Sequence, residues 1–131
     1  MLNYISDIEA LLTECQNIQT DLEVTLSDDM NELIDHGNDL VVYLARTGKM
    51  LSDAKYLQDK AINKSILNIL KEHGNISPSI AKQLIDSTCE KENYLVSWCD
   101  RLNRSCTHQV DWIRSVVSKN KEEMKMNHFL K

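Results

Sequence analysis

The sequence predicts an all-α protein, because turn-forming residues are scarce and apolar residues recur at helical spacing over long segments. Its 131 residues include only three Gly and one Pro, so there are few points at which a helix must end. Apolar side chains return every three or four residues through most of the chain, which places them on one side of a helix. We therefore predict one helical domain over residues 1–131, an elongated bundle of three long helices and one short helix.

The first long helix is expected over residues 3–26. The apolar residues of this helix form a stripe along one side: Ile5, Ile8, Leu12, Cys15, Ile18, Leu22 and Leu26. The stripe is narrow, which is typical of a helix that pairs with one or two neighbours. Residues 27–29 are suited to cap a further helical stretch, which Gly37 is expected to end. Residues 1–36 would then form an acidic pairing region and residues 38–126 the helical core.

The second long helix is expected from Asp39 to His73, where Gly74 and Asn75 follow, and residues 63–65 are a candidate kink. Gly48 lies in its middle, at a cost of about 1 kcal/mol relative to Ala. Either this glycine allows another backbone or a ligand to come close, which we expect, or it is a tolerated defect in the helix. Ser77 and Pro78 have the order of a helix cap followed by a first helical residue, and they predict a short helix that ends near residue 86.

The last long helix is expected over residues 87–126, opened by a capping box of Ser87 and Glu90. Residues 127–131 are expected to fray. The apolar stripe of this helix must be buried and consists of Leu95, Cys99, Leu102, Cys106, Val110, Ile113 and Val117. Helices this long expose apolar side walls, so we expect a homo-oligomer.

Charge divides the chain into two unequal parts. Residues 1–45 contain ten Asp and Glu but no Lys or Arg, whereas the remainder contains fifteen Lys and Arg and ten acids. The acidic part can pack on the basic part within a chain or between chains. Because it also repels a polyanion, duplex DNA is not an expected partner.

Catalysis, metal binding and membrane insertion have no sequence support. The four cysteines form no CxxC pair and are expected to be reduced core thiols rather than metal ligands or disulfides. The histidines form no HxxxH pair, and no nucleophile stands beside a base, so we expect neither an enzyme nor a cofactor. No apolar run approaches the ~20 residues of a membrane span, and no secretory signal precedes residue 10. A cytoplasmic protein is expected.

Two rows of aromatic and basic residues are the candidate ligand site. The late row, on the last long helix, consists of Tyr94, Arg101, Arg104, His108, Trp112 and Lys119. The early row, on the second long helix, consists of Tyr43, Arg46, Lys49, Tyr56 and Lys60. Arginine and lysine can hold phosphate, aromatic rings can stack on a base, and His108 can donate a hydrogen bond. If the two helices are antiparallel neighbours, the rows can converge on one cleft.

The alternative is a second packing face. In that arrangement Tyr94 and Trp112 meet another helix, and the arginines pair with the acids of residues 1–45. The sequence leaves both possibilities open.

Two segments resemble small α-helical proteins of bacteriophages and mobile elements: GNDLVVYLARTGKMLSDAKY (residues 37–56) and NYLVSWCDRLNRSCTHQVDWIRSVVSKNKEEM (residues 93–124). The resemblance covers about residues 37–126 and implies a phage setting, hence the cytoplasm of a host cell. Some such proteins are oligomeric sponges for nucleotide signals of bacterial immunity, and others lie near single-strand recombination genes.

The leading hypothesis is therefore a non-enzymatic, oligomeric binding protein that captures a small anionic, nucleotide-like ligand as an anti-defence sponge. The alternative is a helical adaptor that pairs with a host or phage protein, or an accessory to single-strand DNA recombination. A sponge binds small nucleotides, whereas DNA binding depends strongly on salt.

Overall fold

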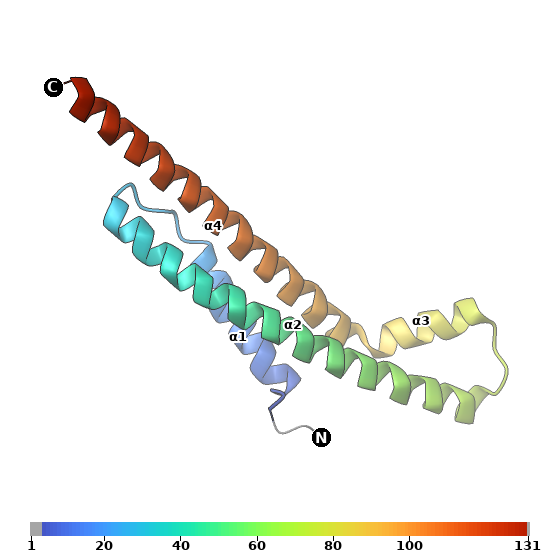
Figure 1. Cartoon of the computed structure of the whole chain (residues 1–131). Helices are drawn as coiled ribbons and strands as arrows, with labels where there is room; N and C mark the ends of the chain where they lie inside the picture. The colour runs from blue at the N-terminus through green and yellow to red at the C-terminus, as the bar shows by residue number, and fades with distance from the viewer. Residues whose placement is uncertain (1–3, 131) are drawn as a thin grey trace.

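The computed structural model describes residues 4–130, which form four helices (Figure 1). They are α1 (Ile8–Leu22), α2 (Met30–His73), α3 (Pro78–Thr88) and α4 (Glu90–Leu130). The longest are α2 with 44 residues and α4 with 41. The predicted all-α architecture of three long helices and one short helix is confirmed.

The long helices α2 and α4 lie side by side and run in opposite directions (Figure 1). Hydrogen bonds between Gln58 and Asn93 near one end, and between His36 and Gln109 near the other, mark the antiparallel pairing. α1 packs on both long helices and runs parallel to α4. Each long helix extends past the other at one end, so the molecule is elongated.

The core lies where these three helices meet. Its fully buried large side chains include Leu11 of α1, Leu40 and Met50 of α2, and Leu95 and Leu102 of α4. The predicted stripe of α4 is buried from residue 95 to residue 113, except that Val110 is half-buried. The middle of the seam between α2 and α4 also holds polar groups: the side-chain amide of Asn103 donates to the hydroxyl of Thr47 at 3.0 Å.

The first helix is shorter than predicted. It begins at Ile8, because the Asp7 side chain accepts a hydrogen bond from the backbone N–H of Ala10 at 2.8 Å and so caps the helix start. It ends at Leu22 rather than residue 26. The predicted start at Asn3 lies outside the described residues. On this helix Leu11 is buried, whereas Leu12, which the predicted stripe included, is half-buried.

Gly37 does not end a helix, which corrects the predicted boundary. α2 passes through it without a break, because Leu33 and Leu40 on either side are buried at the seam. Burying side chains of this size contributes about 1.5–3 kcal/mol each, which exceeds the about 1 kcal/mol that glycine costs a helix. A Cβ at Gly37 would lie 3.4 Å from Ile113.

Gly48 is not a point of close approach, which corrects the second glycine prediction. A Cβ built there would meet the side-chain nitrogen of Asn103 at 3.8 Å, an ordinary contact distance. The helix also continues through residues 63–65, which were a candidate kink. By contrast, Asp29 caps α2 and Ser77 caps α3 ahead of Pro78, so both predicted helix starts are confirmed.

The boundary between α3 and α4 lies later than predicted. Ser87 belongs to α3, which continues to Thr88, and α4 begins at Glu90, so no capping box opens α4. Cys89 joins the two helices and is buried, and its N–H donates to Ile85. Residues 127–130, expected to fray, continue α4. Lys131 lies outside the described residues.

All four cysteines are buried free thiols, as expected of core thiols. The Cys15 and Cys99 sulfurs approach to 3.6 Å where α1 meets α4. Burial raises the pKa of the Cys106 thiol above its ordinary value. Across residues 4–130, the structure contains no helix that combines the length and the apolar character of a membrane span.

Two glycine substitutions test this description of α2. We expect Gly48→Ala to raise the free energy of unfolding by up to about 1 kcal/mol, because alanine is the better helix former and has room here. Gly74→Ala should lower it by about 1–3 kcal/mol, because Gly74 follows α2 at φ +63°. Urea denaturation followed by circular dichroism measures both values. A Gly48→Ala variant less stable than the parent would contradict the open space beside residue 48.

Candidate functional site

The first two residues of the early row are engaged by acids of α1. The Tyr43 hydroxyl donates to the Asp21 carboxylate. The Arg46 guanidinium donates through Nε and Nη2 to the two oxygens of Glu14, the second at 2.8 Å. At the early row, acids of residues 1–45 thus occupy basic and aromatic residues, which the sequence left open. The second packing face considered for the late row is not found in the described part of the chain, because Tyr94 and Trp112 are exposed and Arg104 pairs with Asp100 of its own helix.

The other residues of the early row interact with neighbours on or near their own helix. Lys49 pairs with Asp53 one turn later, and its ammonium lies 5.8 Å from the centre of the Tyr4 ring. The ammonium of Lys60 lies 5.2 Å from the centre of the Tyr56 ring. Asp53 is buried, and its second oxygen has no hydrogen-bond partner among the described residues. Lys49 therefore balances a buried charge.

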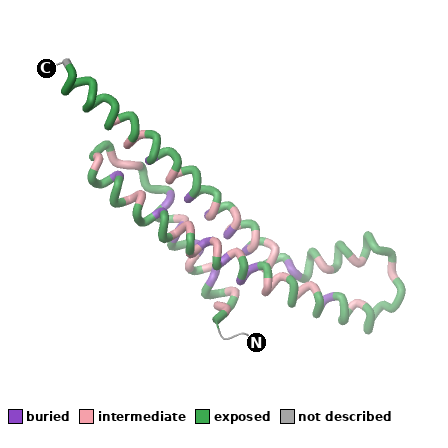
Figure 2. Tube along the Cα trace, in the orientation of Figure 1, coloured by how far each residue is buried: buried purple, intermediate pink, exposed green. Residues whose placement is uncertain are grey.

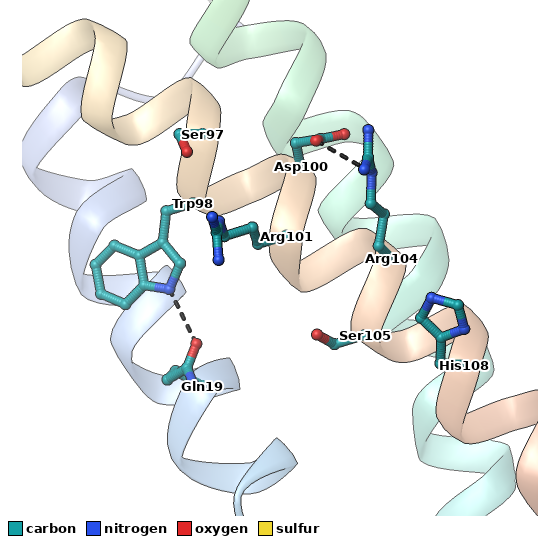
Figure 3. A pocket seen from close by; sticks show the side chains of 8 residues that line it. All are labelled: Gln19, Ser97, Trp98, Asp100, Arg101, Arg104, Ser105 and His108. Carbon is teal, nitrogen blue, oxygen red and sulfur yellow. Dashed lines mark hydrogen bonds and ion pairs between the residues drawn. The ribbon is translucent and has the colours of Figure 1, made fainter.

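Part of the late row lines a hollow of about 780 Å³ on the outer side of α4. Its walls are formed by Gln19, Ser97, Trp98, Asp100, Arg101, Arg104, Ser105 and His108 (Figure 3). All but Gln19 come from α4, so the hollow follows one helix. Tyr94, Trp112 and Lys119 of the late row do not line it, and the rings of Tyr94 and Trp112 are about 60% exposed.

The polar groups of the hollow differ in how far they are already paired. Arg104 lies 3.2 Å from the Asp100 carboxylate. Arg101 extends toward Trp98 in Figure 3 and has no acidic partner among the described residues. The Trp98 indole N–H donates to Gln19 of α1 at 3.0 Å. Arg101 and His108 are thus the groups here that an anion could reach without displacing a carboxylate.

The early and late rows do not converge, because α1 lies between them. Glu14 and Asp21, which engage the early row, lie seven residues apart on one flank of α1. Gln19, which contacts Trp98 beside the late row, lies about 140° around the helix from Glu14. A shared cleft between the two rows required α2 and α4 to be antiparallel neighbours, and they are. Their two rows nevertheless open on different sides of α1.

The predicted rows did not include five of the residues that line the hollow: Gln19, Ser97, Trp98, Asp100 and Ser105. Trp98 follows Tyr94 by four residues and precedes Arg101 by three, so the spacing alone could have included it. Its ring packs against that of Tyr94, with centres 5.6 Å apart. Gln19 could not have been found in this way, because only the packing of α1 brings it to α4.

Pairing with acids shifts two ionisations in the early row. The hydrogen bond from Tyr43 to Asp21, with partial burial and the nearby negative charge, raises the pKa of Tyr43 to about 12. The hydrogen bonds to Glu14 raise the pKa of Arg46 above its ordinary value. Both shifts favour the protonated, acid-bound form, so these side chains are held by α1.

No group of three or more metal-ligating side chains occurs among residues 4–130. In comparisons with known proteins, no family model, no curated protein and no solved structure matches the chain. The resemblance to phage proteins over residues 37–126 therefore stays a prediction.

The Tyr43 contact can be tested by titration. A tyrosine in the unfolded chain loses its proton near pH 10, whereas Tyr43 retains it to about pH 12. The contact therefore stabilises the fold fully below pH 10, and this contribution is lost as the pH rises to 12. We expect tyrosinate absorbance to include a late ionisation that Tyr43→Phe removes.

Tyr94→Phe, at an exposed tyrosine of α4, is the matched control and should leave the late ionisation in place. Identical titration curves for the parent and Tyr43→Phe would show that Asp21 does not hold this hydroxyl.

Proposed function

We propose that this protein is a non-enzymatic helical interaction protein that works as an assembly of identical chains. The observation that carries the proposal is the position of its exposed large apolar side chains. Of the fifteen such side chains among residues 4–129, eight lie at the two ends of the molecule: Ile66, Leu67, Leu70, Ile80, Leu84, Met124, Met126 and Phe129. Figure 2 places long exposed segments at the same two ends.

Contiguous groups of exposed apolar side chains are stronger evidence of a binding surface than scattered ones. Single exposed apolar residues are normal on any protein surface, whereas contiguous groups mark surfaces that another molecule covers. At the end of α4, residues 121–129 are all exposed, and they include Phe129, which is 92% exposed. At the opposite end, α3 has no buried residue. A protein partner would remove these side chains from water.

The packing of α1 favours this proposal over ligand capture between the two rows. Capture of an anionic ligand in a shared cleft needs Lys or Arg side chains without carboxylate partners on both long helices. Arg46 is paired with Glu14 and Lys49 with Asp53, so two cations of the early row already have carboxylate partners. What the long helices leave uncovered is helical surface at their ends.

Mass measurement tests the proposal. In light scattering coupled to size exclusion at ~100 µM, we expect a mass about twice that of the 15.1 kDa chain, falling toward the single chain on dilution to below 1 µM. Cross-links between chains should disappear over the same range. A single-chain mass at every concentration up to ~100 µM would overturn the proposal.

A second candidate function is the binding of a small anionic, ring-bearing ligand at the hollow of α4. The specific observation in its favour is that Arg101 and His108, which line the hollow, have no acidic partner among the described residues. Arg101 extends toward the Trp98 ring, and His108 lies further along α4, past Ser105 (Figure 3). This candidate retains the nucleotide-like ligand and the anti-defence role expected from the phage resemblance. It places the ligand on α4 alone.

A thermal-shift screen with linear and cyclic adenine and guanine nucleotides tests the second candidate. A nucleotide present at 100 times its Kd stabilises the fold by about 2.7 kcal/mol, which raises the melting temperature by several degrees. We expect Arg101→Ala to abolish this shift. Arg114→Ala, at an exposed arginine of α4 outside the hollow, should preserve it. Equal shifts in both variants would remove the hollow as the ligand site.

A further inference from the structure

An exposed apolar element of the molecule is the hairpin of residues 62–88, formed by the end of α2 and by α3. It projects beyond the start of α4 (Figure 1). Among its residues that belong to helices, only Ser65 is buried. Two amphipathic helices have thus formed with apolar sides that are only partly covered, although burial of such sides is what normally stabilises short helices.

Its apolar side chains recur at helical spacing on both helices. On α2, Ile66 and Leu70 lie four residues apart, and on α3, Ile80 and Leu84 do the same. Leu70 is 59% exposed and Ile80 is 51% exposed. Between the helices a hollow of about 170 Å³ is lined mainly by Ile66, Ile69, Leu70, Ile76, Ala81 and Ile85. This space can receive a large apolar side chain.

We propose that the hairpin docks on the same hairpin of a second copy of this chain, so that four helices enclose one apolar centre. The inference rests on the proposed function and names the surface through which the identical chains assemble. Helical hairpins with one apolar side commonly reach a stable packing as four-helix bundles. A twofold arrangement makes the two surfaces identical, so each hairpin supplies the residues that the other lacks.

The distribution of charge favours a second copy at this end. The ten acids and no bases of residues 1–45 make two copies repel each other where those segments meet. The hairpin itself carries Lys64, Lys71, Lys82, Glu72 and Asp86, a nearly balanced set that can form ion pairs with an identical set. Two chains that meet through their hairpins also keep their acidic segments apart.

The surface that two hairpins can bury on each other indicates the size of the interface between the two chains. Each hairpin helix presents a face roughly 17 Å long and 10 Å wide. Side chains make the accessible area larger than the flat outline of these faces. Two hairpins therefore bury on the order of 1,000 Å² in total, which is near the lower bound for a specific interface. An interface of this size is typical of weak or transient association, so we expect dilution to separate the two chains.

Charged substitutions at the two ends of the molecule test the inference. We expect Leu70→Glu and Ile80→Glu, one on each hairpin helix, to reduce the assembled mass at ~100 µM to that of the single chain. Met124→Glu, at a 64% exposed side chain near the other end, is the matched control and should leave the assembly intact. Circular dichroism should give the parent's helix content for all three variants, because each replaces an exposed side chain.

The outcomes separate this inference from the function on which it rests. A parent that stays a single chain overturns both. A parent whose assembly survives both hairpin substitutions overturns the hairpin as the interface but leaves the interaction protein in place. If only Met124→Glu dissociates the chains, the interface lies at the end of α4 instead.

Discussion

The seam between α2 and α4 is the contact on which the other features depend. Leu33, Leu40, Thr47 and Ala54 follow one another at seven-residue intervals on α2 and are all buried. Asn103 of α4 donates to the Thr47 hydroxyl and to the Leu44 carbonyl in the middle of this stripe. A slip of the two helices would leave these buried polar groups unpaired, which costs about 1–3 kcal/mol per group. The register is thereby set, and with it the lengths by which each helix extends past the other.

α1 determines what the remaining surface can do. Its apolar stripe covers one side of the seam, while Glu14 and Asp21 take up the guanidinium of Arg46 and the hydroxyl of Tyr43. The acids of the first 45 residues are thus partly paired within the chain. Arg46 and Lys49 of the early row already have carboxylate partners, which a phosphate would have to displace. The surfaces left free are the outer side of α4 and the two ends, which is why assembly fits the geometry better than a shared ligand cleft.

Local signals predicted the helices, and contacts between helices decided the rest. Ser77 and Pro78 start α3 as predicted, because a cap acts within one helical turn. Gly37 failed as a helix end because the burial of Leu33 and Leu40 against α4 outweighs a local preference. The site was harder to predict, since Arg46 meets an acid 32 residues away in the chain, and no spacing rule places α1 between the rows. Of the predicted site residues, Arg101, Arg104 and His108 line one hollow of α4 together.

The buried contact between the Cys15 and Cys99 thiols allows the packing of α1 to be followed without an engineered label. Both thiols are fully shielded while α1 is in place, and a soluble alkylating reagent reaches them only when that helix lifts from its neighbours. Because a short helix opens more often than the whole molecule unfolds, the rate of modification at Cys15 reports the detachment of α1 by itself. The alkylation rate of Cys15 therefore measures how often the acidic helix α1 detaches from α2 and α4.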